Sequence, residues 1–365
     1  MNKIFHIDVE NGFRGGQRQT LLLMKGLAGL GIQGILGART GSEVALRAKE
    51  MDLIVEEIPY RFEYDPFAMH AIHRLVSKHQ IKLLHAHSSH SHGLACTAVR
   101  LSRSSPRSSV VVHRRVDDPP RSGFLNRIKY SWPDRYIAIS PQVKQVLVDF
   151  GVPKAEIEVI GSGVPGIQTN PHDREKIRDT LEIPSGAILI GNVAHFVSHK
   201  GHSDLITAFA ELRRSHRDVF LCLVGGGELH SALINQIKKS DLVDYVKMPG
   251  IVGNVAPFYS AFDMYVQSSR TEGLGTAVLD AFSAKIPVVS TTAGGLSYIV
   301  VHGETGISCP PADPSALARA MATVLEYPQI TEKRAERAYE LWKTRHSVEV
   351  MSQKVADLYA RLCSF

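Results

Sequence analysis

Cysteine is scarce in this sequence, and no apolar run approaches the roughly 20 residues that span a lipid bilayer. The 365 residues include 4 cysteines, which lie far apart and form no CxxC pair: Cys96, Cys222, Cys309 and Cys363. This spacing argues against a disulfide framework and against a cysteine-ligated zinc site. The segment Met1–Val9 contains a short apolar run without a cleavage site, which is typical of a buried strand and unlike a secretory signal. We therefore expect a cytoplasmic protein, one that can also lie at the inner face of the cytoplasmic membrane.

Acidic residues are fewer than basic ones, and 36 Asp and Glu against 42 Lys and Arg give a formal net charge of +6. Such an excess favours an anionic partner, which could be a phosphate, a nucleic acid or an acidic membrane surface. Part of the excess lies between Arg100 and Lys129, where eight Lys or Arg stand against Asp117 and Asp118. This stretch is either a solvated face or a surface for an anionic acceptor or membrane. Because no aromatic residue interrupts it before Phe124, nucleic acid is not the expected partner.

Short β-branched runs alternate with helical patterns along the chain. The expected strands are Ile4–Val9, Ile81–His87, Ser109–His113, Arg135–Ser140 and Ile157–Ile160 in a first series, then Ile188–Val193, Val219–Val224, Val246–Met248, Met264–Gln267 and Pro287–Thr291 in a second. The expected helices include Gln17–Leu30, Ala68–Lys78, Ser203–Ser215 and Ser315–Tyr327. Repeated alternation of strand and helix predicts parallel sheets covered on both faces by helices.

A chain of 365 residues exceeds the usual size of one hydrophobic core. The segment Gly161–His172 is rich in Gly and Pro and has no apolar period, so it divides the series in two. We expect an α/β protein with two Rossmann-like, doubly wound domains, residues 1–165 and 166–346, that face each other across a cleft. Residues 347–365 contain an amphipathic helix, Ser347–Leu362, with no strand after it.

The segment Tyr265–Ser290 carries the clearest chemical signal. A buried strand ends in a polar turn, glycines follow, and a helix is expected from near Thr276. Free backbone N–H groups and the positive end of such a helix suit a phosphate. Glu272 precedes this anion site, and Asp280 follows about two helical turns later, on a similar face. One carboxylate could bind a transferred sugar and the other a ribose; the alternative is that both are solvated surface acids.

The same run resembles the E-x7-E segment of the family-4 retaining glycosyltransferases of the GT-B fold, in which a GxPVV strand follows. This sequence continues Lys285-Ile-Pro-Val-Val, with lysine in place of the glycine, and Asp280 replaces the second glutamate. By this resemblance Glu272 is a catalytic residue. The resemblance also implies a set of donor-binding residues in this run: Gly273, Leu274, Gly275, Thr276 and Asp280.

Other segments match the family in the expected order. Gly15 and Gly16 follow the first strand and resemble the loop that approaches the donor diphosphate. The strand that ends at His113 resembles the one whose terminal histidine faces the transferred sugar, which implies a catalytic role for this residue. The basic pair that follows, Arg114 and Arg115, could meet an anionic acceptor.

The stretch Ile190–His202 resembles the G-R-L-x-x-x-K-G loop of the family, in which a basic pair holds the leaving diphosphate. Lys200 matches the lysine and is therefore a catalytic candidate, whereas His195 stands where the family has arginine. Because a histidine is only partly charged near neutral pH, phosphate binding would rely on the lysine and the helix terminus. Gly250 and Ile251 match a segment beside the nucleobase and are weaker donor-binding candidates.

The resemblance implies a hexosyltransferase that moves a sugar, with retention, from a nucleoside-diphosphate sugar to a glycan or lipid-linked acceptor. Synthesis of lipopolysaccharide or a related envelope glycan is the expected setting. The first domain would bind the acceptor and the second the nucleotide sugar, and the C-terminal helix would pack back on the first domain. No cofactor is expected, and no metal is required, because no DxD-like pair stands at a strand end.

Two other interpretations compete with this one. The substitutions at His195 and Asp280 also fit an inactive homologue that binds a sugar nucleotide or a glycan. In addition, four histidines are clustered in the sequence: His85, His87, His90 and His92. The first two share one strand face, so with His113 they could bind zinc. The resemblance instead explains their strand as the family's D-x-I/L-H-x-H segment, with the aspartate replaced by Lys82 or lost.

Overall fold

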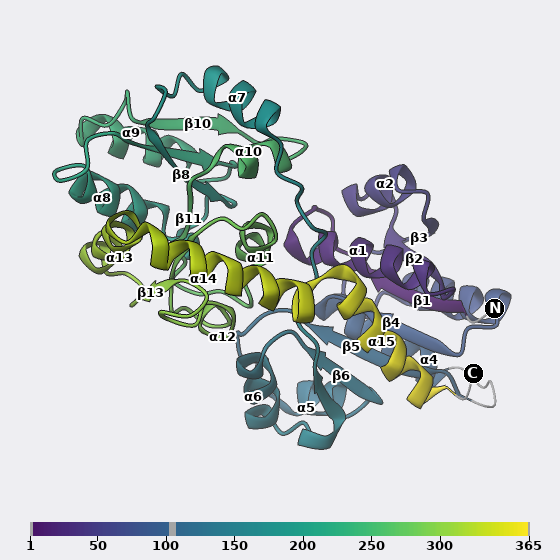
Figure 1. Ribbon diagram of the computed structural model, residues 1–365. Coiled ribbons are helices and arrows are strands. Elements are labelled where there is room, and N and C mark those ends of the chain that lie inside the picture. The colour runs from purple at the N-terminus through teal and green to yellow at the C-terminus, as the bar shows by residue number, and fades with distance from the viewer. Residues whose placement is uncertain (1–2, 102–106, 364–365) are drawn as a thin grey trace. The chain divides into compact units, whose positions relative to one another are not determined.

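The computed structural model describes residues 3–101 and 107–363, and the chain forms two compact units (Figure 1). Unit 1 comprises Met1–Val164 and Ser347–Phe365, and unit 2 comprises Pro165–His346. Each unit has its own parallel sheet, with strand order β3-β2-β1-β4-β5-β6-β7 in unit 1 and β10-β9-β8-β11-β12-β13 in unit 2. The expectation of two Rossmann-like sheets is therefore confirmed. In the part of the chain that is described, every helix is too short or too polar to cross a membrane.

The elements of unit 1 follow the predicted alternation. Its strands are β1 (Lys3–Asp8), β2 (Gln33–Arg39), β3 (Ile54–Ile58), β4 (Leu83–Ala86), β5 (Ser109–Arg114), β6 (Arg135–Ala138) and β7 (Ile157–Val159). Its helices are α1 (Gly15–Gly29), α2 (Glu43–Glu50), α3 (Pro66–His79), α4 (Ser89–Leu101), α5 (Phe124–Tyr130), α6 (Pro141–Phe150), the 3-10 turn η1 (Lys154–Glu156) and α15 (Val348–Leu362).

Unit 2 repeats the pattern. Its strands are β8 (Ile188–Val193), β9 (Val219–Val224), β10 (Val246–Gly250), β11 (Met264–Gln267), β12 (Val288–Thr291) and β13 (Ile307–Cys309). Its helices are α7 (Pro171–Thr180), the 3-10 turn η2 (Ser198–Lys200), α8 (His202–Leu212), α9 (His230–Lys239), α10 (Ala256–Ala261), α11 (Thr276–Ser283), α12 (Leu296–Ile299), α13 (Pro314–Glu326), α14 (Pro328–Leu341) and the π-helical segment η3 (Trp342–His346).

Three strands were not predicted from the sequence: β2, β3 and β13. In β2, glycine weakens the β pattern, but the structure needs it, because a Cβ on Gly37 would lie 2.6 Å from Phe5 Cζ. Strand β3 is an edge strand with two acidic residues, and β13 has only 3 residues. Segments with a weak local pattern therefore become strands because they pair with neighbouring strands of the sheet.

Helix α15 belongs to unit 1, although unit 2 lies between it and the rest of that unit in the sequence. Ser347 begins the helix by accepting a hydrogen bond from the Val350 N–H. One face of α15, with Met351, Val355 and Tyr359, is buried in the same core as residues of α1, β4, β5 and β6. Each such side chain contributes about 1.5–3 kcal/mol by burial. The expected return of the C-terminal helix to the first domain is confirmed.

Small residues set the distance between α1 and α15. A Cβ on Gly26 would lie 2.0 Å from Ser352 Oγ and 2.9 Å from Val348 Cγ1, whereas a Cβ on Gly29 meets nothing within 4 Å. We expect Gly29→Ala to raise the free energy of unfolding by up to about 1 kcal/mol through helix propensity. Gly26→Ala should lower the free energy of unfolding, because α15 must shift away from α1. Urea unfolding of the two variants tests this, and equal stabilisation by both would contradict it.

Candidate functional site

In each sheet the strand order reverses once, between β1 and β4 in unit 1 and between β8 and β11 in unit 2. The connections on either side of such a point lead to opposite faces of the sheet, so a crevice opens at the carboxyl ends of the two strands. The loops after β8 and β11 contain Lys200 and Glu272, and the loops after β1 and β4 border a pocket in unit 1. The candidate residues therefore lie where this class of sheet binds ligands.

Lys200 and Glu272 form an ion pair in unit 2. Lys200 Nζ lies 2.5 Å from Glu272 Oε2, and Ser269 Oγ donates to the same carboxylate oxygen over 3.1 Å. Both charged side chains are largely shielded, with exposed fractions of 20% for the lysine and 13% for the glutamate. The structure thus brings together two of the three predicted catalytic residues, which are 72 positions apart in the sequence. Ser269 was not predicted from the sequence. The pattern that could have identified it is a polar residue at the end of a buried strand.

Glycine is required on both sides of this ion pair. Gly201 has φ +67°, and a Cβ there would lie 2.0 Å from the Ser268 carbonyl oxygen. Gly275 has φ +90° and precedes the first residue of α11, Thr276, as the sequence predicted. The first turn of α11 has no acidic residue that would repel an anion at the positive end of the helix.

The other predicted donor-binding residues of unit 2 have different surroundings. His195 is exposed in the loop after β8, and Ile251, at 81% exposure, follows Gly250 at the end of β10. Leu274 and Asp280 are 2% exposed, the latter inside α11. Because Glu272 lies in the loop before this helix, the expectation that it shares a helical face with Asp280 is wrong.

Unit 1 contains a pocket of about 490 Å³ at the carboxyl ends of its central strands. It is lined by three predicted site residues from the end of β5 and the loop after it, His113, Arg114 and Arg115, and by Gly16 from α1. Gly15 is the first residue of the same helix. The described lining also includes residues that the sequence did not single out: Glu10, Asn11, Gly12, Arg14, Gln17, Ser88, Ser89, Val112, Val116 and Tyr130, with His87 and His92 from the histidine cluster.

A chain of hydrogen bonds through buried histidines lies beside this pocket. Arg115 Nη2 donates to His87 Nδ1 over 2.9 Å, and His87 Nε2 lies 2.9 Å from His6 Nδ1. Because a guanidinium can only donate, His87 Nδ1 must be unprotonated and its Nε2 must donate to His6. Arg115 Nη1 also lies 3.4 Å from His113 Nε2, which places the proton of His113 on Nδ1. The arginine thereby fixes the tautomers of its neighbours.

The histidines of this cluster are neutral at pH 7. Burial, with a contribution from the Arg115 charge, lowers the pKa of His6 to about 3. Burial is also the main cause that holds the pKa values of His85, His87 and His113 well below the usual range, and neighbouring histidines and the Arg115 charge lower all three further. His85 Nδ1 lies 2.5 Å from the Tyr359 hydroxyl, so α15 contributes to the cluster.

Within the described residues, His6, His85 and His87 have ring nitrogens within 4.8 Å of one another, as a metal site requires. This set differs from the zinc alternative drawn from the sequence, which used His113 in place of His6. His87 has both ring nitrogens engaged, by Arg115 and by His6. The adjacent guanidinium charge also opposes a cation, so the donor set fits a metal poorly. Metal independence stays a prediction.

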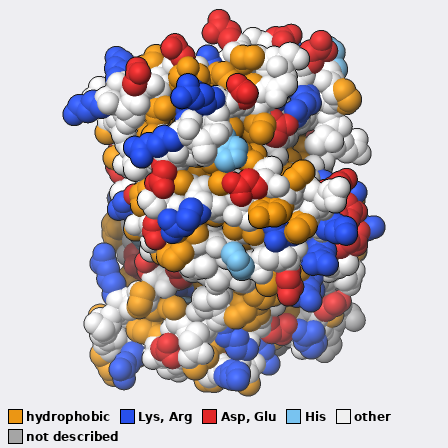
Figure 2. All heavy atoms as spheres, turned by 60° about the vertical axis from the view of Figure 1, so that its left-hand side comes forward, with side chains coloured by type: hydrophobic (Ala, Val, Ile, Leu, Met, Phe, Trp, Pro, Cys, Tyr) orange, Lys and Arg blue, Asp and Glu red, His pale blue; other side chains and the backbone are white. Residues whose placement is uncertain are grey.

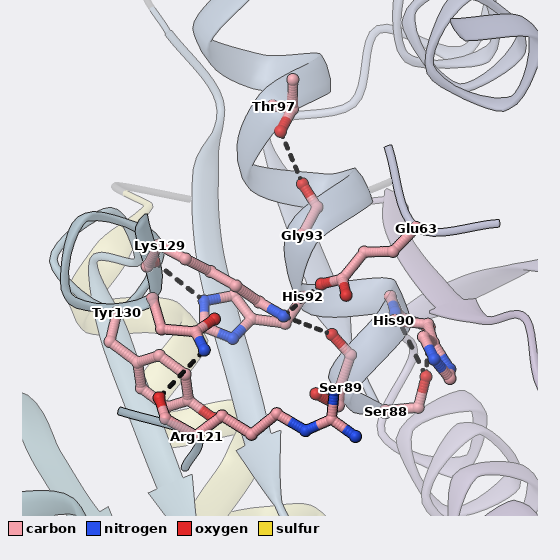
Figure 3. A network of polar contacts seen from close by, with 12 residues as sticks. Glu63, Ser88, Ser89, His90, His92, Gly93, Thr97, Arg121, Lys129 and Tyr130 are labelled. Atoms are coloured by element: carbon pink, nitrogen blue, oxygen red, sulfur yellow. Dashed lines mark hydrogen bonds and ion pairs between the residues drawn. The ribbon is translucent and has the colours of Figure 1, made fainter. Parts of the chain in front are cut away.

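A second polar network supports the loop between β4 and α4 (Figure 3). The Lys129 side chain is 4% exposed; its Nζ forms an ion pair with Glu63 and donates to the Ser89 carbonyl over 2.9 Å. His92 Nε2 lies 3.1 Å from the Lys129 carbonyl oxygen. This lysine belongs to the basic stretch singled out in the sequence, but its charge is neutralised internally and it is no part of a basic surface.

Two family models match the chain in succession. The model of Glycosyltransferase Family 4 matches residues 13–165, and that of Glycosyl transferases group 1 matches residues 173–341. The chain belongs to the family-4, group 1 glycosyltransferases and has the GT-B fold, which confirms the resemblance found in the sequence.

Individual relatives are distant. The chain is 29% identical over 249 residues to a glycogen synthase of Mycobacterium tuberculosis, a match that covers 65% of this chain and 58% of that relative, less than two thirds of its length. It is 28% identical over 249 residues to the lipopolysaccharide core biosynthesis glycosyltransferase LpsE of Rhizobium meliloti, covering 68% and 69%. A crystal structure of HepE from Anabaena, in complex with UDP and glucose, superimposes with a TM-score of 0.86 at 21% identity and covers 99% of this chain and 100% of that one.

The buried histidines predict a loss of stability in acid. Their folded pKa values lie below 6.5, so the unfolded chain binds more protons and the free energy of unfolding falls as the pH is lowered from about 6.5. Burial raises the pKa of Asp8 to about 6, which opposes this trend between pH 3.8 and 6, but it is one group against four. We expect the melting temperature to fall between pH 7 and 5, less steeply in His6→Gln than in the exposed control His70→Gln. If the melting temperature fell equally steeply in both variants, the low pKa inferred for His6 would be contradicted.

Proposed function

We propose that this protein is a retaining glycosyltransferase that moves a hexose from a nucleoside-diphosphate sugar to a glycan or lipid-linked acceptor. Family membership supports transfer of a sugar, and the HepE structure, which contains UDP, supports a nucleotide sugar as the donor. The likeness to LpsE favours lipopolysaccharide or a related envelope glycan as the product. In this proposal unit 2 binds the donor and unit 1 the acceptor.

The observation that carries the proposal is the Lys200–Glu272 ion pair beside the N-terminus of α11. A cation and a helix N-terminus can both stabilise a departing diphosphate. Lys200 is tied to the Glu272 carboxylate over 2.5 Å. A diphosphate would compete for its ammonium group, and the released carboxylate could then accept hydrogen bonds from hydroxyls of the transferred sugar. The ion pair thus holds both the Lys200 ammonium and the Glu272 carboxylate in position before the donor binds.

The chemical step breaks the bond between the anomeric carbon and the diphosphate, and the electron pair leaves with the diphosphate. Preorganised positive groups at that position lower the barrier because they need no rearrangement as charge develops. Lys200 and the α11 N–H groups supply them in unit 2, with Gly15 and Gly16 as further donor contacts and His113 as a partner for a sugar hydroxyl. Retention requires the acceptor oxygen to form its bond to the anomeric carbon on the face that the diphosphate leaves, and its proton passes to the departing diphosphate; no enzymic nucleophile is assigned. These groups neutralise charge without a metal ion, as the proposal expects.

The remaining donor contacts follow the family pattern. Asp280 would bind the ribose from α11, Gly250 and Ile251 would lie near the base, and His195 would lie near the phosphates. Ile251 fits a base contact because 81% of its surface is exposed at the end of β10.

A lipid-linked acceptor would bring unit 1 to a membrane. Phe124 and Leu125, the first two residues of α5, are 77% and 79% exposed, and the exposed Arg121 and Arg127 flank them. Exposed apolar side chains with basic neighbours suit the interface of an anionic bilayer. By contrast, basic and acidic side chains intermix over the face shown in Figure 2, which offsets the positive charge there.

Lys200→Ala and Glu272→Ala should each reduce sugar transfer or donor hydrolysis by about 100-fold or more, because each removes a group that acts on the developing charge or on the sugar. Lys239→Ala, an exposed lysine of α9, is the matched control and should leave turnover unchanged. Release of nucleoside diphosphate from a panel of nucleotide sugars measures the rates. Nucleotide binding without turnover in the unaltered protein would favour the inactive homologue instead.

For the membrane contact, we expect the protein to sediment with phosphatidylglycerol vesicles at low salt and to be released at high salt. The double variant Phe124→Ser, Leu125→Ser should bind more weakly because it loses the inserted apolar area. Val243→Ser, which removes an exposed apolar residue from unit 2, is the control. An absence of sedimentation at low salt would rule the membrane contact out.

A further inference from the structure

Strand β11 and the two residues after it have an apolar face and a polar face, although both faces are buried. Met264 and Val266 belong to the apolar core of unit 2, whereas the alternate positions Tyr265, Gln267 and Ser269 carry polar groups. These three residues are 0%, 2% and 0% exposed. A buried polar group costs free energy unless it is hydrogen-bonded, and apolar side chains of the same shape can be equally stable. Stability of the sheet alone therefore does not explain the polar face.

The three polar groups form a chain of hydrogen bonds. The Tyr265 hydroxyl donates to Gln267 Oε1 over 2.7 Å, and Gln267 Nε2 donates to Ser269 Oγ over 2.8 Å. Burial raises the pKa of the Tyr265 hydroxyl, so it keeps its proton and can donate. The chain ends at the Glu272 carboxylate, whose Oε2 accepts from Ser269 Oγ over 3.1 Å.

The direction of each bond in this chain is set from the carboxylate end. A carboxylate can only accept, so the single proton of the Ser269 hydroxyl must point to Glu272. Ser269 Oγ is then free to accept from the Gln267 amide, which turns the amide oxygen toward the Tyr265 hydroxyl. The chain thus has one arrangement of protons, and its last donor points to the carboxylate.

The backbone on both sides of the last bond is fixed as well. The Thr291 hydroxyl, from β12, donates to the Ser269 carbonyl oxygen over 2.6 Å, and the Gly295 N–H donates to the Glu272 carbonyl oxygen over 2.8 Å. Within the described residues, the Glu272 side chain has two polar partners, Lys200 and Ser269. These two contacts therefore decide where the carboxylate points.

The two contacts respond differently to a bound donor. A diphosphate competes for the Lys200 ammonium in the proposed function, which weakens the ion pair. Ser269 is uncharged and fully buried, so a diphosphate does not compete for its hydroxyl. The serine contact remains when the carboxylate has to meet the hydroxyls of the sugar.

We propose that Tyr265, Gln267 and Ser269 are positioning residues that keep the Glu272 carboxylate directed at the transferred sugar while the diphosphate occupies Lys200. This inference rests on the proposed function, because it names the groups that orient the sugar-binding carboxylate. Ser269 acts on Glu272 directly, and the other two act through Ser269. A carboxylate that is already oriented needs no rearrangement when its hydrogen bonds to the sugar strengthen in the transition state.

Ser269→Ala removes the last donor of the chain. With the full-length protein and a panel of UDP-, GDP- and ADP-linked hexoses, release of nucleoside diphosphate gives kcat for the best donor. Calorimetry gives the affinity for the nucleoside diphosphate of that donor. We expect kcat to fall about tenfold, because a hydrogen bond to a charged group is lost. The nucleoside diphosphate has no sugar for Glu272 to bind, so its affinity should stay within about twofold.

Thr331→Ala is the matched control. It also removes a buried hydroxyl of unit 2, one that donates to the Val324 carbonyl oxygen over 3.1 Å and lies in α14, outside the loops after β8 and β11. It should leave both kcat and the nucleoside diphosphate affinity unchanged.

Gln267→Met breaks the chain one step earlier. The Tyr265 hydroxyl can then turn to the Val193 carbonyl oxygen, 3.4 Å away, and Ser269 keeps its proton for Glu272. We expect this substitution to lower kcat about threefold when Ser269 is present and to have no effect in Ser269→Ala, because Gln267 acts through the serine. The double variant also leaves no buried amide without a partner, so it provides the comparison if Ser269→Ala alone is unstable.

Unchanged kcat in Ser269→Ala would overturn the proposal. An equal loss of kcat and of nucleoside diphosphate affinity would also overturn it, because the whole donor site would then be disturbed and not the carboxylate alone. The same fold-loss from Gln267→Met with and without Ser269 would contradict the chain. If the unaltered protein releases nucleoside diphosphate from none of the donors, the proposed function itself fails, and the inference fails with it.

Discussion

The strand order of the two parallel sheets is the constraint on which the functional features depend. Because β1 pairs with both β2 and β4, and β8 with both β9 and β11, the connections leave these strands toward opposite faces. The loops at their carboxyl ends therefore separate and expose backbone N–H groups and side chains that a continuous strand order would cover. The Lys200–Glu272 pair and the unit 1 pocket both lie at such a point.

The two positions where the strand order reverses differ in how a positive charge is compensated. In unit 2 the cation Lys200 is paired with the Glu272 carboxylate, so the pair carries little net charge. In unit 1 the cation Arg115 contacts neutral histidines, whose low pKa values keep them from adding positive charge. The first arrangement compensates the positive charge with a carboxylate, and the second surrounds it with neutral partners.

Much of the fold could be predicted from the sequence because the signals are local. The alternation of β-branched runs and helical patterns placed ten strands, and Thr276 was identified as a helix start from the glycines before it. Strands β2, β3 and β13 were missed because their local patterns are weak, and pairing with neighbouring strands is what defines them. His6 and Asp8 were missed as well, although two polar residues at alternate positions of a buried strand are a usable signal.

By itself, the sequence determined the α/β class, the division of the chain near residue 165, and the motifs that mark Lys200, Glu272 and His113. Only the tertiary structure decided that Arg115 would lie against Gly16 and that Tyr359 of the last helix would reach His85. These contacts join β5, α1, β4 and α15, and the strands meet in an order that differs from their order in the chain. Parallel pairing is non-local, so the neighbours of a side chain, and with them its charge state and tautomer, cannot be read from its own segment.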